Sequence, residues 1–170
     1  MKKIAAAALV CAFGLALAAP AGATNGHGPK KAASETATLT VDVATGTGTV
    51  TAGGAFSGTG TVATLKGKLA GRTHHFVEQL TFGSDTVTIK AVAVRVHRTV
   101  DSSTCAVTEK DRGVWKITSG TGAFANAKGE GRLVANASVT GTPDSTKPHG
   151  CDFSHLTGTV TVDAKGRVRG

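Results

Sequence analysis

The segment from Gly113 to Gly131 constrains the fold more than any other part of this 170-residue chain. In its first half, Trp115 and Ile117 alternate with polar residues, which is the period of two that a half-buried β-strand shows. Gly120 and Gly122 follow, and glycine adopts backbone angles that other residues resist. The sequence therefore predicts a strand, a structural corner built on these two glycines, and a return strand.

Short alternating segments rich in valine and threonine continue on both sides of this corner, with glycines between them. After residue 23, no segment keeps the apolar repeat near 3.6 residues that an amphipathic helix needs. The connections are short, which favours antiparallel order because parallel strands need crossovers of a dozen residues or more. We therefore expect a single all-β, antiparallel domain.

Two local features of these strands can be predicted. Gly53 and Gly54 separate two copies of Gly-Thr-Gly-Thr-Val, and they suit a two-residue hairpin turn that needs positive φ angles. Between residues 85 and 98, the apolar phase shifts from odd to even positions after Ala91. A one-residue β-bulge near Ala91 would reconcile the two phases, and a strand covered on both faces is the alternative.

The first 23 residues have the features of a secretory signal peptide. Lysines at positions 2 and 3 precede the apolar stretch Ile4–Ala19, and Ala21 and Ala23 supply the small residues of a cleavage site. The apolar stretch is too short to span a bilayer comfortably and no second one follows, so we expect no transmembrane segment. These features predict a protein that is secreted to the extracellular space or held in the cell envelope.

Cleavage after residue 23 would leave 147 residues, enough for one domain. Residues 24–35 contain glycine, proline and paired lysines and predict a flexible leader, whereas residues 36–170 predict the folded domain. The shortened chain has 17 Lys and Arg against 11 Asp and Glu, spread without the aromatic interleaving of a nucleic-acid groove. We expect a solvated basic surface and no nucleic-acid partner, with attraction to an anionic envelope polymer as the alternative.

Two cysteines follow the signal peptide, Cys105 and Cys151. Export makes a disulfide their expected state, and closing this loop would stabilise the fold by roughly 4 kcal/mol through the entropy of the unfolded chain. His149 and His155 flank Cys151, so a Cys2His2 zinc site is the alternative. The spacing matches no common zinc finger or ribbon, which favours the disulfide.

Glu78 is the polar residue that stands out among the candidate core positions. It shares one face of a predicted strand with Phe76, Leu80 and Phe82, and an unpaired carboxylate there is costly. Glu78 is therefore either a paired structural group or a cavity residue that orients a polar ligand head or, with a raised pKa, transfers a proton. Trp115 is expected in the core, or as a wall against which a ligand stacks.

These residues define the candidate site. The ligand-binding candidates are Phe76, Glu78, Leu80 and Trp115, and Glu78 is the best catalytic candidate.

No motif indicates a cofactor or a metal. The run from Gly120 to Ala125 formally fits the dinucleotide fingerprint, but that fingerprint needs the start of a helix, and the glycines at 129 and 131 break any helix there. His74 and His75 are adjacent, so on a strand they point to opposite faces and cannot readily share one metal ion. We expect a surface or rim position for both histidines, no cofactor and no metal site.

The corner resembles the Gly-Thr-Gly segment of the dirigent and allene oxide cyclase-like β-barrel superfamily. The matching residues are Gly120, Thr121, Gly122, Phe124, Ala127 and Gly129, and the strong likeness covers about residues 113–134. The resemblance implies an eight-stranded antiparallel closed barrel with a central cavity, often secreted and trimeric, which in some members steers a reactive small molecule. This chain has no tyrosine, and the polar catalytic residues of the plant members are not carried over to it.

Three functions follow from the sequence and this resemblance. The first is a secreted barrel that binds a small, largely apolar molecule without chemistry. The second is a cyclase-like or dirigent-like enzyme, an isomerase in the broad sense, with Glu78 as its polar group. The third is a packed structural or interaction protein of the cell envelope. Homo-oligomerisation, as a trimer, is implied by the resemblance alone, and the filling of the barrel interior distinguishes the three functions.

Overall fold

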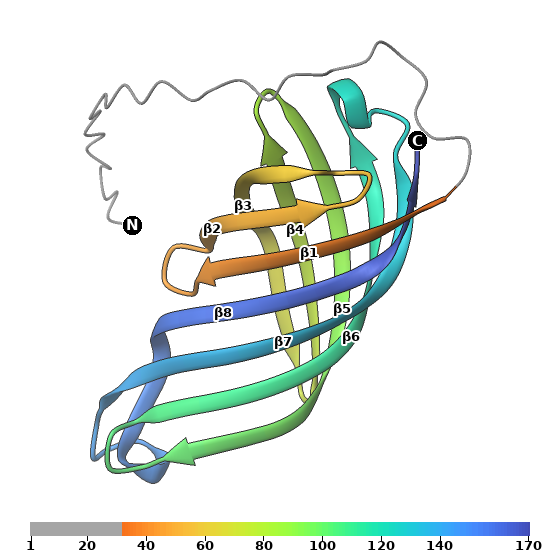
Figure 1. The fold of residues 1–170 in the computed structure, drawn as a ribbon. Coiled ribbons are helices and arrows are strands. Elements are labelled where there is room, and N and C mark those ends of the chain that lie inside the picture. Colours follow the sequence, from red (N-terminus) through yellow and green to blue (C-terminus); the bar gives the residue numbers. More distant parts are fainter. Residues whose placement is uncertain (1–31) are drawn as a thin grey trace, which may run out of the picture.

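The computed structural model describes residues 32–170, which form a closed barrel of eight antiparallel strands (Figure 1). The strands are β1 (Ala33–Asp42), β2 (Thr47–Gly53), β3 (Gly58–Ala70), β4 (Thr73–Phe82), β5 (Asp85–Asp101), β6 (Ala106–Gly120), β7 (Lys128–Pro143) and β8 (Cys151–Arg169). Two short 3-10 helices, η1 (Gly122–Phe124) and η2 (Pro148–Gly150), lie between strands. The expected all-β antiparallel barrel is confirmed. The expected signal peptide lies outside the described residues.

The first and last strands close the ring. β1 pairs with β8 along its whole length, from Ala33 opposite Val168 to Asp42 opposite Thr159. β1 thus begins at Ala33, three residues before the expected domain boundary, because these residues find backbone partners on β8. Closure pairs the strand edges that an open sheet would expose. No helix within residues 32–170 is long and apolar enough to cross a membrane.

The strands differ in length, which gives the barrel two unlike ends. β5 to β8 have 15 to 19 residues each, whereas β1 has 10 and β2 has 7. The long strands extend beyond the short ones at the lower end of Figure 1. A disulfide between Cys105 and Cys151 joins the β5–β6 turn to the start of β8 at this end. Both thiols are used in this bond, so neither remains as the zinc ligand of the alternative site.

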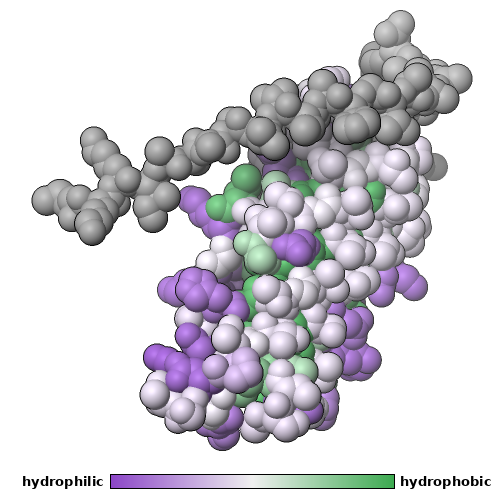
Figure 2. Space-filling model, turned by 90° about the vertical axis from the view of Figure 1, so that its left-hand side faces the viewer, coloured by the Kyte–Doolittle hydropathy of each residue, from purple (hydrophilic) through white to green (hydrophobic). Residues whose placement is uncertain are grey.

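Alternate side chains of each strand point into the barrel. On β4 these are His74, Phe76, Glu78, Leu80 and Phe82, all buried or half-buried. The most deeply buried apolar side chains of the other strands include Leu39, Val50, Val62, Val87 and Val168. On the face shown in Figure 2, apolar residues are confined to a band between pale and hydrophilic ones.

The strand β5 keeps one phase through the position where a bulge was expected. Ala91 and Ala93 are both buried, and the bulge lies further along, between Arg95 and His97. A second register shift, opposite Thr88, places its extra residue on β6. The prediction of a bulge near Ala91 is therefore wrong. Because the alternation of β5 is not shifted near Ala91, the side chain of Arg95 points into the barrel.

The predicted two-residue turn at Gly53 and Gly54 is also wrong. Residues 54–57 form a longer connection between β2 and β3, in which Ala52 pairs with Gly58. This connection buries Phe56 in the core. The extra length is therefore used to place an aromatic ring at the end of the barrel.

The predicted corner at Gly120 and Gly122 is confirmed. Gly122 has φ +53°, which β-branched residues avoid, and a side chain there would collide with the Asp85 carboxylate. Gly120 has no positive φ, but a side chain would collide with the backbone of Phe124. Two different constraints therefore require glycine at these positions.

Candidate functional site

A small cavity lies inside the barrel. Its volume is about 40 Å³, enough for about three waters at roughly 10–15 Å³ each. The lining is almost entirely apolar except for two carboxylic acids. The lining residues are Glu35, Ala37, Leu39, Ala52, Phe56, Glu78, Leu80, Phe82, Ile89, Ala91, Trp115, Leu133, Val162 and Ala164.

Glu78 lines this cavity from the middle of β4. Its side chain is on the inner face, as predicted, and the residue is only 9% exposed. No side-chain hydrogen bond or ion pair links it to another residue within 32–170. Burial disfavours the charged form and raises the pKa of Glu78 to about 7. This carboxyl group can therefore change protonation near neutral pH.

Glu35 is a second carboxylic acid in the same cavity, and it is not among the site residues predicted from the sequence. Its Oε2 accepts a hydrogen bond from the backbone N–H of Phe56 at 3.2 Å, while Oε1 has no partner within the described chain. Burial raises the pKa of Glu35, and the backbone N–H groups of Phe56 and Ala55 partly oppose that rise. Glu35 alternates with Ala37 and Leu39, so the period used for Glu78 could have found it.

Trp115 lines the cavity from β6, and its indole is buried. The Nε1–H group has no hydrogen-bond partner among residues 32–170. The ring lies against Gly166 of β8, where a side chain would collide with it. A buried N–H without a partner costs about 1 to 3 kcal/mol, so Trp115 brings an unused donor to the wall of the cavity.

The structure brings together three of the four predicted ligand-binding residues. Glu78, Leu80 and Trp115 all line the cavity. Phe76 does not line it. Its ring packs against the neighbouring core and lies edge-on to His74, with ring centres 6.3 Å apart.

Three phenylalanine rings meet at one end of the cavity. The ring centres of Phe56 and Phe124 are 4.8 Å apart, and those of Phe82 and Phe124 are 5.8 Å apart. Phe56 and Phe82 line the cavity, whereas Phe124 belongs to η1 in the glycine corner. Asp85 stabilises this corner, because its Oδ2 accepts a hydrogen bond from the backbone N–H of Ala123 at 3.1 Å. The corner therefore holds one ring of an aromatic cap over the cavity.

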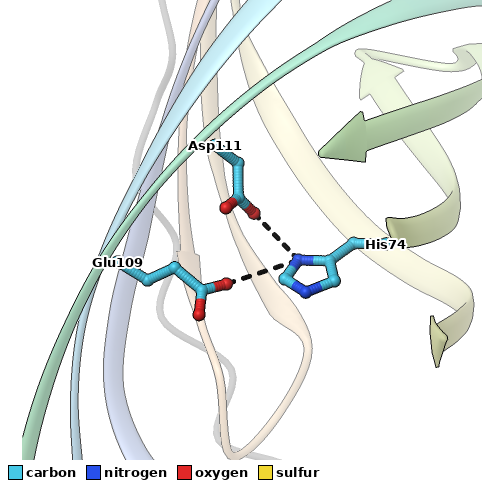
Figure 3. Close-up of side chains that lie close together, drawn as sticks. All are labelled: His74, Glu109 and Asp111. Atoms are coloured by element: carbon cyan, nitrogen blue, oxygen red, sulfur yellow. Dashed lines mark hydrogen bonds and ion pairs between the residues drawn. The ribbon is translucent and has the colours of Figure 1, made fainter. Parts of the chain in front are cut away.

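A second polar group, which we call the charged cluster, consists of His74, Arg95, Glu109 and Asp111. Figure 3 shows three of them, His74, Glu109 and Asp111. His74 Nδ1 donates a hydrogen bond to Asp111 Oδ2 at 2.8 Å and lies 3.4 Å from Glu109 Oε1. Arg95 Nε lies 2.7 Å from Glu109 Oε2, in an ion pair whose N–H is not aimed along a hydrogen bond. His74 is 4% exposed, so the predicted surface position of this histidine is wrong.

His74, Glu109 and Asp111 offer ligand atoms within 4.8 Å of one another, a spacing compatible with a metal ion. The contacts of Arg95 oppose that use. Arg95 Nη2 lies 3.3 Å from His74 Nε2, and because guanidinium nitrogens only donate, Nε2 must accept and Nδ1 must carry the proton. A protonated Nδ1 that donates to Asp111 has no lone pair for a metal. The arrangement is a hydrogen-bonded ion-pair network.

The charged cluster could not be recognised from one strand alone. Glu109 and Asp111 continue the inner face of Trp115 on β6, so the alternation could have shown that both acids point inward. Their partners come from β4 and β5, and the register of three strands decides the contacts. The bulge expected near Ala91 would also have turned Arg95 away.

Comparisons with known proteins give no match: no protein-family model fits the chain, and no curated protein or solved structure matches it. The class of the protein is therefore defined by its own fold and interior. It is an eight-stranded antiparallel barrel with a small apolar cavity that contains two carboxylic acids. The likeness of the corner to the dirigent and allene oxide cyclase-like superfamily stays an expectation from the sequence.

Proposed function

We propose that the protein binds a small, largely apolar molecule that carries a hydrogen-bonding oxygen, with its apolar part in the barrel cavity. The observation that supports this most directly is the set of unpaired polar atoms around an apolar space. Glu78 lacks a polar partner among residues 32–170, as do Oε1 of Glu35 and Nε1 of Trp115. A ketone or alcohol oxygen could accept from Trp115 or from protonated Glu78.

The cavity volume limits the size of such a ligand. Ligand pockets usually enclose roughly 300 to 1,000 Å³, far more than the 40 Å³ of this cavity. A ligand of more than a few non-hydrogen atoms therefore requires the aromatic cap of Phe56, Phe82 and Phe124 to move. The cap is the natural place for such movement because Phe56 and Phe124 lie in short connections between strands and Phe82 is the last residue of β4.

Fluorescence provides a direct test, because Trp115 is the only tryptophan and the chain has no tyrosine. The protein would be titrated with small cyclic ketones and with the hydrocarbons of the same ring size. We expect a saturable change in Trp115 emission, with the ketone bound more tightly than the hydrocarbon. Glu78→Leu should reduce this preference, whereas Glu130→Leu on the outer face should not. No saturable change with any compound would contradict the proposal.

Native mass spectrometry of protein purified from its own source is the complementary measurement. A co-purified small molecule would identify the ligand, and its conversion during incubation would favour the enzyme alternative with Glu78 as the proton donor or acceptor. The small size of the cavity favours a second candidate, a packed structural or interaction barrel. That candidate predicts both that no small molecule co-purifies in the mass spectrum and that Trp115 emission shows no saturable change in the titration.

A further inference from the structure

The outer face of β7 and β8 concentrates the positive charge of the protein. Seven exposed cations lie on this face and on the neighbouring parts of β5 and β6, together with two exposed acids, Glu130 and Asp163. We call this group the basic face. Its cations are Lys90, Lys116, Lys128, Arg132, Lys165, Arg167 and Arg169.

The strand register brings these residues together. Lys128 pairs with Arg169, and Arg132 pairs with Lys165. Glu130 lies between them, opposite Arg167 on β8 and Lys116 on β6. The basic residues that are spread along the sequence are therefore gathered on one side of the barrel, so the expectation of a scattered basic surface is wrong for this face.

The charge of this face exceeds that of the whole described domain. Residues 32–170 contain 15 Lys and Arg and 11 Asp and Glu, a formal charge of +4. The basic face alone has a formal charge of +5, so the remaining described residues sum to −1. No ion pair within residues 32–170 includes any of its seven cations. The positive charge is thus concentrated on this face, and its cations are free of ion pairs within the described residues.

The spacing of the cations suits a linear partner. Lys165, Arg167 and Arg169 are alternate residues of β8, so their positions repeat about every 6.6 Å along the strand. Five of the seven cations and Glu130 also line one continuous surface groove. A chain with one phosphate per short repeat can present an anion to each of these positions, and arginine forks bind phosphate oxygens in pairs.

The face lacks the features of other polyanion-binding surfaces. None of the residues of the basic face is aromatic, and the aromatic residues of β8, Phe153 and His155, lie at the other end of that strand, so the face offers no ring on which a nucleic-acid base could stack. The surface is also part of a curved barrel, which a flexible chain can follow and a flat bilayer cannot. We propose that the basic face binds a flexible anionic polymer with phosphodiester linkages and no bases. This site is on the opposite side of the barrel wall from the cavity and does not depend on the ligand proposed for it.

Binding to poly(glycerol phosphate) tests the proposal, measured by calorimetry at 50 and 200 mM NaCl. We expect saturable binding whose affinity falls on the order of tenfold or more between the two salt concentrations, because several counterions are released. The double variant Arg132→Glu/Lys165→Glu should weaken binding at least tenfold. Lys66→Glu/Lys68→Glu is the matched control, since it makes the same charge change on β3, which is four strands from β7 and three from β8 around the ring. We expect the control to bind within about twofold of the unchanged protein.

Three outcomes would overturn the proposal. Equal weakening by the two variants would show attraction to net charge rather than to the basic face. Tighter binding to single-stranded DNA of equal phosphate number, or to phosphatidylglycerol vesicles without binding to the free polymer, would assign the face to another partner. Absence of saturable binding at 50 mM NaCl would also contradict it. Thermal unfolding of each variant would verify that the exposed substitutions leave the barrel folded.

Discussion

Two polar groups of side chains lie inside the same barrel and differ in how their charge is compensated. In the cavity, Glu78 has no polar partner within the described chain and Glu35 has backbone partners for one oxygen only. In the charged cluster, Arg95 lies against Glu109, and His74 lies against both Glu109 and Asp111. Every charged group there has an ionic or hydrogen-bonding neighbour, although Arg95 Nε and Asp111 Oδ1 make no hydrogen bond within residues 32–170. Both groups use the inner face of β4, where only three residues separate His74 from Glu78.

The two groups show two ways of burying a carboxyl group. One has partners and stabilises the structure, and the other has none and stays available for function. A buried ion that has partners is tolerated, and removing one partner is costly because the other stays buried and unpaired. A buried carboxyl without partners is instead kept neutral by a raised pKa, as burial does for Glu78. We therefore expect the charged cluster to contribute to the stability of the folded barrel. The cavity carboxyls should instead be available to a ligand.

Breaking the charged cluster should have the largest effect. Arg95→Met keeps most of the side-chain length but leaves Glu109 without its closest cation. We expect the free energy of unfolding to fall by about 3 kcal/mol, at the low end of the range for removing one partner of a buried ion pair, because the Arg95 side chain is 21% exposed. Urea denaturation at pH 7 measures this.

Arg98→Met is the matched control for that experiment. Arg98 is also on β5, but its Nε is 3.8 Å from Glu109 and its side chain is 34% exposed. We expect a loss below about 1 kcal/mol, as for a solvent-exposed pair. If the two methionine variants are equally stable, the charged cluster is not the compensated network that its geometry indicates.

The unpaired carboxyl of Glu78 predicts a pH dependence. Its pKa rises from 4.5 to about 7 on folding, so the folded protein binds a proton more readily than the unfolded chain between these values. The stabilisation is complete below pH 4.5 and is lost as the pH rises through about 7. At 1.36 kcal/mol per pKa unit, this loss is about 3 kcal/mol.

Glu78→Gln should remove that dependence, because glutamine imitates the protonated acid at every pH. The variant and the unchanged protein should have similar stability at pH 4, and the variant should be more stable at pH 8. Glu35 titrates in both proteins, so its contribution cancels in the comparison. Parallel curves for Glu78→Gln and the unchanged protein would show that Glu78 has partners.

The sequence predicts what depends on local periodicity and misses what depends on register. Alternation was enough to predict an all-β fold and the inward position of Glu78, and the glycines predicted the corner. Glu35 was missed because it precedes the expected boundary at residue 36, and only pairing with β8 shows that β1 starts earlier. Arg95 was missed because the position of one bulge decides which face it occupies.

The basic face was missed for the same reason. Arg132 and Lys165 are distant in sequence and become neighbours through the β7–β8 register. Such registers depend on turn lengths and bulges, which one strand does not specify. The charged cluster depends on the register of three strands, so alternation along a single strand predicts its contacts even less well.

The glycine corner tests whether the aromatic cap belongs to the cavity. Gly122→Val places a β-branched residue at φ +53° and against Asp85, so we expect a loss of about 2 kcal/mol, within the 1–3 kcal/mol typical of a strained backbone position. The variant should also displace Phe124 and change the emission of Trp115. Ala123→Val is the control, because Ala123 is exposed and has no positive φ. An unchanged melting temperature for Gly122→Val would contradict the assignment of the corner.

Trp115→Phe should have the smallest effect, and it sharpens the contrast between the two polar groups. In the charged cluster, every removal leaves a buried partner behind, whereas the Nε1–H of Trp115 has no partner among residues 32–170. Its removal relieves an unsatisfied donor, which offsets part of the packing lost with the larger ring. We expect a net change below about 1 kcal/mol in the free energy of unfolding, together with weaker binding of the ketone probes. Since the variant has no tryptophan, calorimetry must measure that binding. A loss of 3 kcal/mol or more would mean that the indole N–H is part of a compensated network, and the distinction between the cavity and the charged cluster would then fail.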